Sequence, residues 1–372
     1  MQLIEVFNDV GQLSGSAIQL LVNAEKRGSS LGDSWYGNLT KTIYSDLDTV
    51  NFYVLSRGEQ CLAVLPLRIE KNRFTTHVNS LTNFYTTLYE PIVTTTLKSH
   101  ELVPVLQRIL RDHPRTSTLT FAQMDPAAHG YQILLAALRR TGLPAFEYFS
   151  FGNWYLRVPP TWAEYLKSRS STMRNTIKRM GKKFEADQGS FSIATQPDEM
   201  AWAIAAYESV YAASWKVEEP YPEFMPGLLR MCATKGWLRL GVACLGEQPI
   251  AAQVWIVLGG RAEIYKVAYD EHFKHYSPGS LLTAAMMQRA FELDQVVEVD
   301  YLIGDDAYKK TWMSDRRERW GIVAYNPATL AGLFGLLREL SGRALKPWVQ
   351  KMRARKLRGA ANLAPDVSSK QP

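Results

Sequence analysis

The chain has 372 residues, a formal net charge of +7 and a hydrophobic fraction of 46%, which together exclude a mostly disordered protein and suggest two domains. No apolar run approaches the ~18 residues that a membrane span needs. The N-terminal segment has acids but no basic leader, so it does not resemble a secretory signal. The three cysteines are odd in number and have apolar neighbours, which is typical of reduced thiols in a cytoplasmic protein.

Two segments carry most of the positive charge. Residues 167–183 and residues 343–358 each contain seven Lys or Arg and no acid, so the rest of the chain is mildly acidic. An anionic partner should therefore meet these two segments first. The histidines and cysteines show no ligand spacing, and we expect no metal site.

The first half of the chain alternates strands with helices. We expect a hairpin at 48–74, a helix at 100–112, a strand at 117–124, a helix at 127–141 and a strand at 145–158. This order describes an α/β domain, which we place at residues 1–156.

The same order recurs after the break at Pro159-Pro160. The expected elements are a basic helix from Ser170 or Ser171, a helix at 197–215, three antiparallel strands within 236–270, a helix at 280–293, a strand at 296–303, a short helix at 305–314 and a final strand at 319–326. They make a second domain at 157–328. The remaining residues, 329–372, should form a basic amphipathic helix, at 328–345 by its apolar spacing, and a flexible tail at 359–372.

The basic helix has two faces. Met173, Ile177, Met180 and Phe184 follow one another at spacings of 4, 3 and 4, which predicts one apolar stripe. Arg174 and residues 178 and 182 share another face. This face is available to an anionic substrate or RNA, or, alternatively, it is an ordinary solvated surface. Charge alone favours the solvated surface, because no nucleic-acid-binding motif accompanies it.

Residues 265–288 predict a strand, a loop and a helix that begins near Ser280. A helix N-terminus exposes unpaired N–H groups and the positive end of the helix dipole, so it binds phosphate or carboxylate well. Gly279 permits close approach, and Lys274 adds positive charge. The alternative is an ordinary capped helix start, since no Walker or dinucleotide fingerprint is present.

The stretch YLIGDDAYKKTW, residues 301–312, also mixes site-like and structural features. Asp300 lies on an acidic face at the end of the preceding strand, where carboxylates commonly face a cleft. Tyr308 and Trp312 lie four residues apart on the helix that follows. The alternative interpretation is a charged helix start with Trp312 in the core.

Four stretches occur in one order: RSSTMRNTIKRMGKKFE, YKVAYDEHFKHYSPGSLL, VDYLIGDDAYKKTW and RWGIVAYN. Together they resemble the FemAB/CelD-type branch of the GNAT acyltransferase superfamily. The pattern Asp-x-x-x-Gly-x-x-x-Tyr-Lys-x-x-Trp, from Asp300 to Trp312, is its most specific part. LAVLPLRIE and LTNFYTTLYEPIV resemble the companion domain, so the resemblance covers roughly residues 30–330.

The resemblance implies two GNAT-like domains, each a mixed, mostly antiparallel sheet flanked by helices, with the active site in the second. Acyl-CoA is then a co-substrate, and its pyrophosphate lies on Ser277, Pro278, Gly279 and Ser280, with Lys274 nearby. Tyr308 is the implied general acid, and Asp300 or Glu263 takes the proton of the attacking amine. The expected substrate-binding residues are Lys309, Arg174 and Trp312.

The sequence departs from the family pattern at the donor loop. HYSPGS has one glycine and no arginine, so it lacks the usual acyl-CoA signature, although an anion site remains. The chain also has no segment long enough for the helical hairpin that Fem ligases using aminoacyl-tRNA insert. These points leave acyl-CoA, an acyl carrier and aminoacyl-tRNA open as donors, with a thioester favoured.

Three functions follow from the resemblance. The first is an N-acyltransferase that modifies an amine of a sugar, amino acid or cell-envelope or exopolysaccharide precursor. The second is a Fem-like aminoacyltransferase that uses aminoacyl-tRNA. The third is a non-catalytic GNAT fold that acts as a membrane-surface or assembly factor, because the basic C-terminal helix is typical of interfacial anchors at the inner face of a membrane. The alternative for this segment is a C-terminal helix that packs on the body and has a frayed basic end. Nucleic acid is not the expected partner of the first function.

Overall fold

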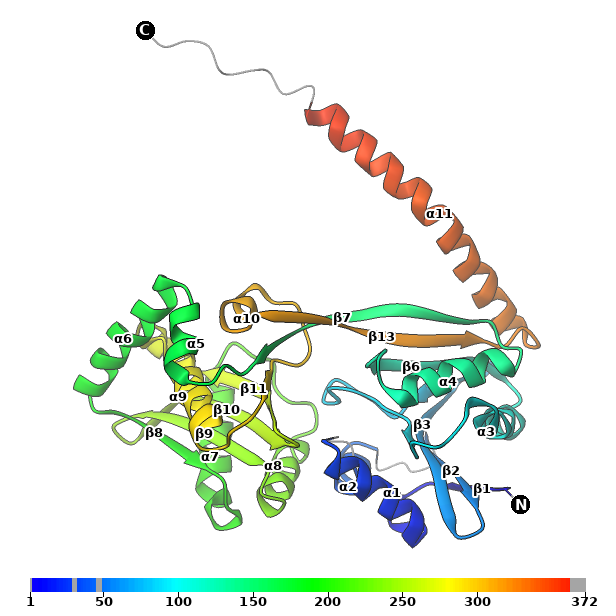
Figure 1. The fold of residues 1–372 in the computed structure, drawn as a ribbon, viewed down its shortest axis with the longest axis horizontal. Coiled ribbons are helices and arrows are strands. Elements are labelled where there is room, and N and C mark those ends of the chain that lie inside the picture. The colour runs from blue at the N-terminus through cyan, green and yellow to red at the C-terminus, as the bar shows by residue number, and fades with distance from the viewer. Residues whose placement is uncertain (1, 29–31, 45–48, 362–372) are drawn as a thin grey trace.

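The structure is a computed structural model that describes residues 2–28, 32–44 and 49–361, with side chains up to residue 345 (Figure 1). One continuous sheet runs through both halves of the molecule. In the described chain thirteen strands join it, in the order β1-β2-β3-β4-β6-β13-β7-β12-β11-β10-β9-β8, with β5 beside β3. The β4–β6 and β11–β12 pairs are parallel and the other pairs are antiparallel. The predicted mixed, mostly antiparallel sheet is confirmed.

The strands of the first half are β1 (Gln2–Phe7), β2 (Val50–Arg57), β3 (Gln60–Lys71), β4 (Thr76–Ser80), β5 (Ile92–Val93) and β6 (Thr116–Met124). Those of the second half are β8 (Gly189–Ala194), β9 (Leu238–Leu245), β10 (Gln248–Leu258), β11 (Arg261–Tyr269) and β12 (Glu298–Asp300). Two long strands, β7 (Ala145–Arg157) and β13 (Asp315–Tyr325), connect the halves.

Helices cover the sheet in both halves (Figure 1). The first half has α1 (Gly15–Lys26), α2 (Asp33–Thr42), α3 (Ser99–Asp112) and α4 (His129–Arg140). The second half has α5 (Trp162–Ser168), α6 (Ser171–Ala186), α7 (Met200–Ala212), α8 (Phe224–Thr234), α9 (Pro278–Glu292) and α10 (Ala307–Trp312). The last helix, α11 (Leu330–Ala361), projects from the body.

The two halves are joined by strand pairing. β13 pairs with β7 from Asp315 to Ala324, and its end, from Trp320 to Tyr325, also pairs with β6 of the first half. The end of β7 pairs with β12 of the second half. The chain therefore returns to the first half before α11 begins, and the boundaries proposed at residues 156 and 328 stay a prediction.

A shared hydrophobic core also joins the halves. It combines side chains of α1 and α2 with side chains of α7 and α8. The Trp35 ring packs edge-on against the Phe224 ring at 5.7 Å, and the Asn38 amide donates a hydrogen bond to the Phe224 carbonyl at 3.1 Å. Since apolar burial and strand pairing both cross the boundary, the surfaces that face each other between the halves are held in place.

Most elements lie where the sequence predicts them, because their apolar periodicity is strong. The apolar stripe of α6, at positions 173, 177, 180 and 184, packs against the core as predicted. The sequence analysis did not find β1, β8, α2 or α8. α11 extends beyond the helix predicted at 328–345, and the tail predicted at 359–372 lies, from residue 362 on, outside the described residues.

The strand β13 should contribute to the stability of the first half. Ile322 is fully buried in the core that α3 and α4 cover. Replacing Ile322 by Ala should lower the free energy of unfolding by about 2–5 kcal/mol, because it removes buried methylene groups and leaves a cavity. Urea unfolding measures this loss. Val323 on the same strand is half-buried, so Val323→Ala should lower the free energy of unfolding by less. Equal losses in the two variants would contradict the role of Ile322 in this core.

Candidate active site

The site begins where two parallel strands separate. β11 and β12 pair over only three positions, from Arg261↔Glu298 to Glu263↔Asp300. Beyond them the chain turns away, because the Tyr301 N–H donates to the Trp154 carbonyl on β7 at 2.9 Å. The side of β11 that faces away from β10 is thereby opened from Ile264 onward, and its backbone groups become available to a ligand.

A β-bulge marks the same point of β11. Val254 of β10 pairs with Lys266, whereas the next residue, Trp255, pairs with Ile264, so Tyr265 is the extra residue. Bulges redirect side chains and raise the local twist of a strand. The Tyr265 hydroxyl donates to the Tyr85 carbonyl at 2.8 Å, which ties the bulge to the first half of the molecule.

A cavity of about 480 Å³, the α9 cavity, occupies the opening beside the start of α9. Gly279 and Ser280 of the first turn line it. Their position is fixed by Gln253 of β10, whose buried side-chain amide donates to the Gly279 carbonyl at 3.0 Å and to the Thr283 hydroxyl at 2.8 Å. Ser277 precedes the helix with φ of 55°, a left-handed conformation that is strained for a residue with a side chain.

The opposite wall is the turn after β12. Leu302, with φ of 54°, and Gly304, with φ of 107°, give this turn its shape. Because a residue with a side chain is strained at the φ of Gly304, glycine suits this position, and a side chain there would also lie 3.0 Å from Asp306 Oδ2 and 3.1 Å from the Lys309 ammonium. Leu302 is held by Asp300, which accepts its N–H at 2.7 Å, and by Asn153, which donates to its carbonyl at 2.9 Å.

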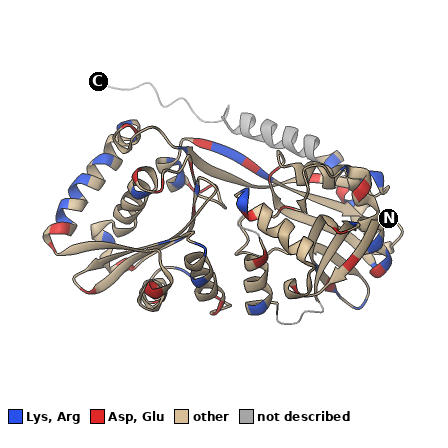
Figure 2. Cartoon of the chain, turned by 60° about the horizontal axis from the view of Figure 1, so that its bottom comes forward, with Lys and Arg blue, Asp and Glu red and all other residues tan. Residues whose placement is uncertain are grey.

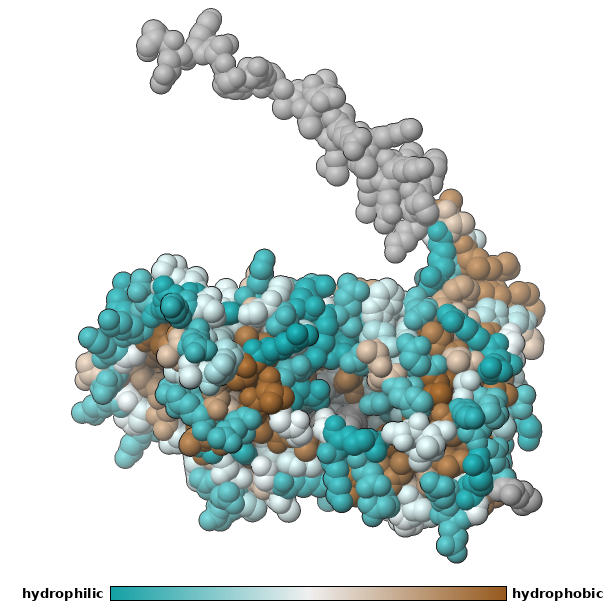
Figure 3. Space-filling model, in the orientation of Figure 1, coloured by the Kyte–Doolittle hydropathy of each residue, from teal (hydrophilic) through white to brown (hydrophobic). Residues whose placement is uncertain are grey.

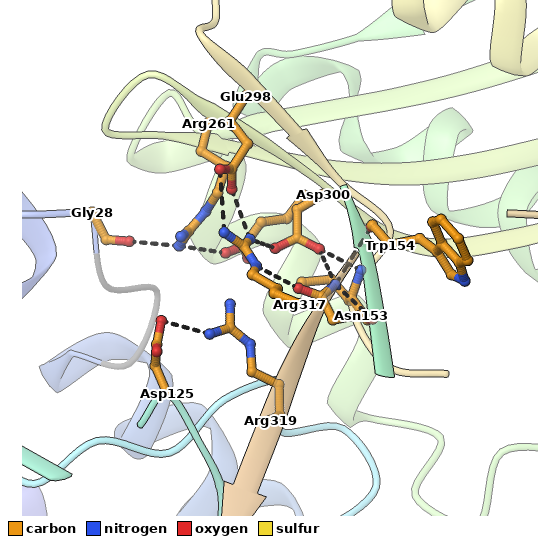
Figure 4. A network of polar contacts seen from close by, with 11 residues as sticks. Gly28, Asp125, Asn153, Trp154, Arg261, Glu298, Asp300, Arg317 and Arg319 are labelled. Atoms are coloured by element: carbon orange, nitrogen blue, oxygen red, sulfur yellow. Dashed lines mark hydrogen bonds and ion pairs between the residues drawn. The ribbon is translucent and has the colours of Figure 1, made fainter. Parts of the chain in front are cut away.

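Asp300 is a buried junction and has no free oxygen toward the cavity. Besides the Leu302 N–H it accepts hydrogen bonds from the Asn153 amide and from the Arg317 guanidinium, each at 2.5 Å. Arg317 also pairs with Glu298 at 2.7 Å. Figure 4 shows these groups pointing toward one another from β7, β12 and β13. Asp300 therefore positions the turn.

Tyr308 stands on α10 between two cavities. Its ring packs edge-on against the buried Tyr301 ring at 5.6 Å, and its side chain is 48% exposed. Partial burial, together with the Asp306 charge, raises the pKa of the Tyr308 phenol to about 12. The phenol is consequently protonated at neutral pH and can donate its proton.

A second cavity of about 300 Å³, the lysine cavity, lies on the other side of Tyr308 and reaches Tyr85 of the first half. Three lysines line it: Lys216, Lys266 and Lys309. Burial lowers the pKa of Lys216, and the nearby charge of Lys266 lowers it further. Burial also lowers the pKa of Lys309, against the opposing effect of Asp306, to which Lys309 is bonded at 3.2 Å.

Glu219 balances part of this positive charge. It pairs with Lys266 at 2.7 Å and accepts the Tyr85 hydroxyl at 2.5 Å. Burial acts to raise the pKa of Glu219, but the hydrogen bonds from Lys266 and Tyr85 outweigh it and lower the pKa below its usual value. Because Lys266 pairs with Glu219 and Lys309 pairs with Asp306, Lys216 is the one of these three lysines without an ion pair to a described residue.

Glu263 lies deeper, between the halves. It lines a crevice of about 200 Å³ together with Arg27, Glu90 and Asp125 of the first half and its ion-pair partner Arg261, bonded at 2.8 Å. One Glu263 oxygen, Oε2, is buried without a hydrogen-bond partner among the described residues. Burial raises the pKa of Glu263 despite the opposing Arg261 charge. Figure 4 shows the neighbouring Arg319–Asp125 pair, which closes the crevice at 2.5 Å.

The structure brings together part of the predicted site. Gly279, Ser280, Tyr308 and Trp312 line the α9 cavity, and Lys309 lines the lysine cavity. Ser277 and Pro278 shape the helix start but are absent from the lining of the α9 cavity.

Two predicted residues lie elsewhere. Lys274 is exposed on the short helix before α9, and it does not line the α9 cavity. The Arg174 guanidinium donates to the carbonyls of Lys167 and Arg169 at 3.0 and 2.8 Å, so it holds the α5–α6 connection. A substrate contact by Arg174 therefore stays a prediction without support from the lining of either cavity.

The sequence analysis missed Lys216, Gln253 and Lys266. Lys216 lies in the connection between α7 and α8, which has no motif of its own. Gln253 is a single polar residue in the otherwise apolar run of β10, and this interruption was the available signal. A buried polar residue inside a strand needs a partner, and here the partner is the start of α9.

Comparisons with known proteins agree with this geometry. Residues 171–310 match the family described as the acetyltransferase (GNAT) domain. FemX is 10% identical and has a TM-score of 0.58, with 90% of this chain and 99% of FemX covered. No curated protein matches the sequence.

Two further structures have the same fold. One is L-PGS from Bacillus licheniformis, 11% identical with a TM-score of 0.51, where 84% of this chain and 92% of that chain are covered. The other is the C-terminal domain (DUF2156) of a protein described as a lysylphosphatidylglycerol synthetase, from Agrobacterium fabrum. It is 11% identical with a TM-score of 0.51, and 85% of this chain and 94% of that chain are covered.

The matched domain and the split strands thus give this chain a GNAT-type acyltransferase fold. Residues 171–310 match a GNAT domain, and 90% of the chain shares the fold of FemX. Within the described residues no three His, Cys, Asp or Glu side chains are grouped as metal ligands. Nor does a helix of the described chain have the length and hydropathy to cross a membrane.

Asp300 should matter more for stability than an exposed aspartate. Replacing Asp300 by Asn should lower the free energy of unfolding by about 1–3 kcal/mol, because buried donors of Asn153, Leu302 and Arg317 lose an acceptor. Urea unfolding measures the loss. Asp198→Asn, at an exposed position, is the control and should change stability little. An unchanged stability in the Asp300 variant would refute the positioning role.

Lys216 should titrate below the usual lysine value of 10.5, because burial and the Lys266 charge disfavour its ammonium form. NMR of protein with ¹³C-methylated lysines measures its midpoint directly. Lys266→Met should move the Lys216 midpoint upward, since a like charge is removed. A midpoint at or above 10.5 in the unmodified chain would show that the lysine cavity does not act on Lys216 as described.

Proposed function

We propose that the protein is an N-acyltransferase that moves an acyl group from acyl-CoA, or an acyl carrier, to an amine. The acceptor amine belongs to a sugar, an amino acid or a cell-envelope or exopolysaccharide precursor. The observation that carries the proposal is the separation of β11 from β12 after three pairs, with Tyr308 bordering the opening. The cavity there can admit the thin, amide-bearing arm of a thioester donor.

The donor lies in the α9 cavity. The opened edge of β11 offers backbone groups to the amides of a thioester arm, in the manner of an added strand. Gly279 and Ser280 present the N-terminus of α9 to the phosphates at the other end of that arm. This arrangement uses the helix start without the arginine that the usual acyl-CoA signature supplies.

The transfer step joins the amine nitrogen to the thioester carbonyl carbon. The new C–N bond forms and the C–S bond breaks, and the thiolate that leaves takes a proton. Tyr308 supplies this proton, since its pKa of about 12 keeps it protonated until the thiolate forms. Lys309 and Lys216 add positive charge beside the tetrahedral intermediate, whose oxygen is negative.

The attacking amine has to lose a proton, and Glu263 is the better candidate base. Asp300 has its oxygens occupied by three donors. Glu263 keeps one buried oxygen without a partner among the described residues, and its raised pKa lies closer to neutral pH, where a general base works best. A narrow cavity that both carboxylates and Leu302 line leads toward the lysine cavity, so water carries the proton between them.

The acceptor enters between the halves of the molecule. Glu90, Asp125 and Glu263 line the crevice and would attract an amine, which is a cation in water. Burial raises the pKa of Glu90, and this too adapts the crevice to proton exchange. The first half of the chain thus supplies acceptor contacts, and the GNAT half supplies donor contacts.

Tyr308→Phe tests the acid role. The variant should lower kcat by about 10²-fold or more, because a positioned acid contributes 10²–10⁴-fold. Its melting temperature should stay close to that of the unmodified chain, since the phenol makes no hydrogen bond that its removal would break within the described residues. Product formation from acetyl-CoA and a panel of amines measures the rate. Unchanged turnover would eliminate Tyr308 as the acid.

The donor class is tested by ligand-induced stabilisation. CoA and acetyl-CoA should raise the melting temperature, because a ligand that binds only the folded state adds about 2.7 kcal/mol of stability at a concentration of 100 Kd. Ser280→Asp, which puts an anion at the start of α9, should remove most of the shift. No shift with either thiol compound would exclude CoA as the donor.

A second candidate is aminoacyl transfer from tRNA. In favour of tRNA, α6 packs beside α9, and its exposed cations at 178, 179, 182 and 183 lie on the outer side of the molecule (Figure 2). RNase-sensitive binding of aminoacyl-tRNA, without a shift by CoA, would select this donor.

A further inference from the structure

The helix α11 meets the body with an unusual set of residues. A side chain at Gly332 would lie 2.1 Å from the Asn326 carbonyl oxygen, so the helix approaches the end of β13 closely. Two and three turns on, Glu339 accepts the Tyr325 hydroxyl at 3.4 Å, and Arg343 donates to the Glu147 carbonyl at 2.9 Å. The side of α11 that faces the body thus consists mainly of glycine and charged residues, with Leu336 half-buried among them.

The apolar residues of α11 lie on the opposite side. Leu330, Leu333, Phe334, Leu337 and Leu340 recur at the spacing of one helix face and point away from the body. Their exposure is high for large side chains, at 89% for Leu330 and 71% for Phe334. Figure 3 shows hydrophobic residues gathered on the first turns of the projecting helix. We call this face the leucine stripe.

This arrangement reverses that of a helix packed on a core, in which the apolar side faces inward. Contiguous exposed apolar side chains are rare on a soluble monomer, and they mark a surface that another partner covers. The strand contacts at Gly332 and Arg343 fix the rotation of α11, so the leucine stripe cannot turn toward the body without breaking them.

Charge indicates what covers the stripe. The same helix continues to Ala361, and between positions 346 and 358 the sequence contains six Lys or Arg and no acid. An apolar face followed by a basic segment is the combination that binds an anionic lipid surface: the apolar side chains enter the acyl boundary and the cations meet the headgroups. A second copy of this chain would bring further positive charge to the stripe and would not neutralise it.

We propose that α11 docks the protein on an anionic membrane through the leucine stripe. The helix lies along the surface of the bilayer and does not cross it. Docking would place the catalytic half beside acceptors carried at a membrane, but the inference depends on α11 alone and stands independently of the acyl transfer.

Vesicle flotation with the full chain tests this. The chain should float with phosphatidylcholine vesicles that contain phosphatidylglycerol, and at least about tenfold less should float with phosphatidylcholine alone. About 0.5 M NaCl should weaken binding by screening the basic segment. The double variant Phe334→Glu/Leu337→Glu should lose at least about tenfold in vesicle affinity, because it puts charge into the stripe.

Phe74→Glu is the matched control. Phe74 is an equally exposed large apolar residue, at 81%, and it lies far from α11 in the sequence, on the turn between β3 and β4. This variant should float like the unmodified chain, and both variants should keep its melting temperature, since the substituted side chains are exposed.

Three results would overturn the proposal. The first is a full chain that does not float with anionic vesicles, and the second is a stripe variant that floats as well as the unmodified chain. The third is a dimer, detected by sedimentation, that the stripe variant dissociates while vesicle binding is absent; it would assign the leucine stripe to a second copy of the chain.

Discussion

The buried junction around Asp300 is the interaction on which the site depends. Asp300 gathers donors from β7 and β13 and from its own turn, so three strands meet at one carboxylate. The Arg317 guanidinium, shared with Glu298, then closes the end of β12. Because these bonds direct the chain toward β7 after three pairs, β12 leaves β11 and the cavity opens. The geometry of Tyr308 and Lys309 follows from the same turn.

Burial acts on the ionisable groups around the cavity in a consistent direction. It raises the pKa of Tyr308 and Glu263 and lowers the pKa of Lys216 and Lys309, which in each case favours the neutral form. A phenol acid and a carboxylate base at different depths are what amide formation requires. The hydrophobic core that the two halves share keeps the burial of these groups fixed.

The contrast between Asp300 and Tyr308 shows what pattern reasoning can assign. Both belong to one short motif, and the motif predicted both at the cavity. Tyr308 lines the cavity, and its role as the acid stays a prediction. Asp300 was expected to take a proton, but its oxygens are consumed by donors from Asn153 and Arg317, which lie about 150 residues before it and 17 residues after it. Lys216 and Gln253 had no motif, since each acts through a neighbour that is distant in the chain.

The sequence by itself determined the periodic elements, the anion-ready start of α9, and the basic and apolar content of α11. These depend on residues within a few positions of one another. Only the tertiary structure decided that β13 returns to the first sheet, that Arg174 serves a loop, that Glu263 keeps a buried oxygen without a partner among the described residues, and that the leucine stripe faces outward. Each of these is set by partners far apart in the chain, whose contacts no local spacing encodes.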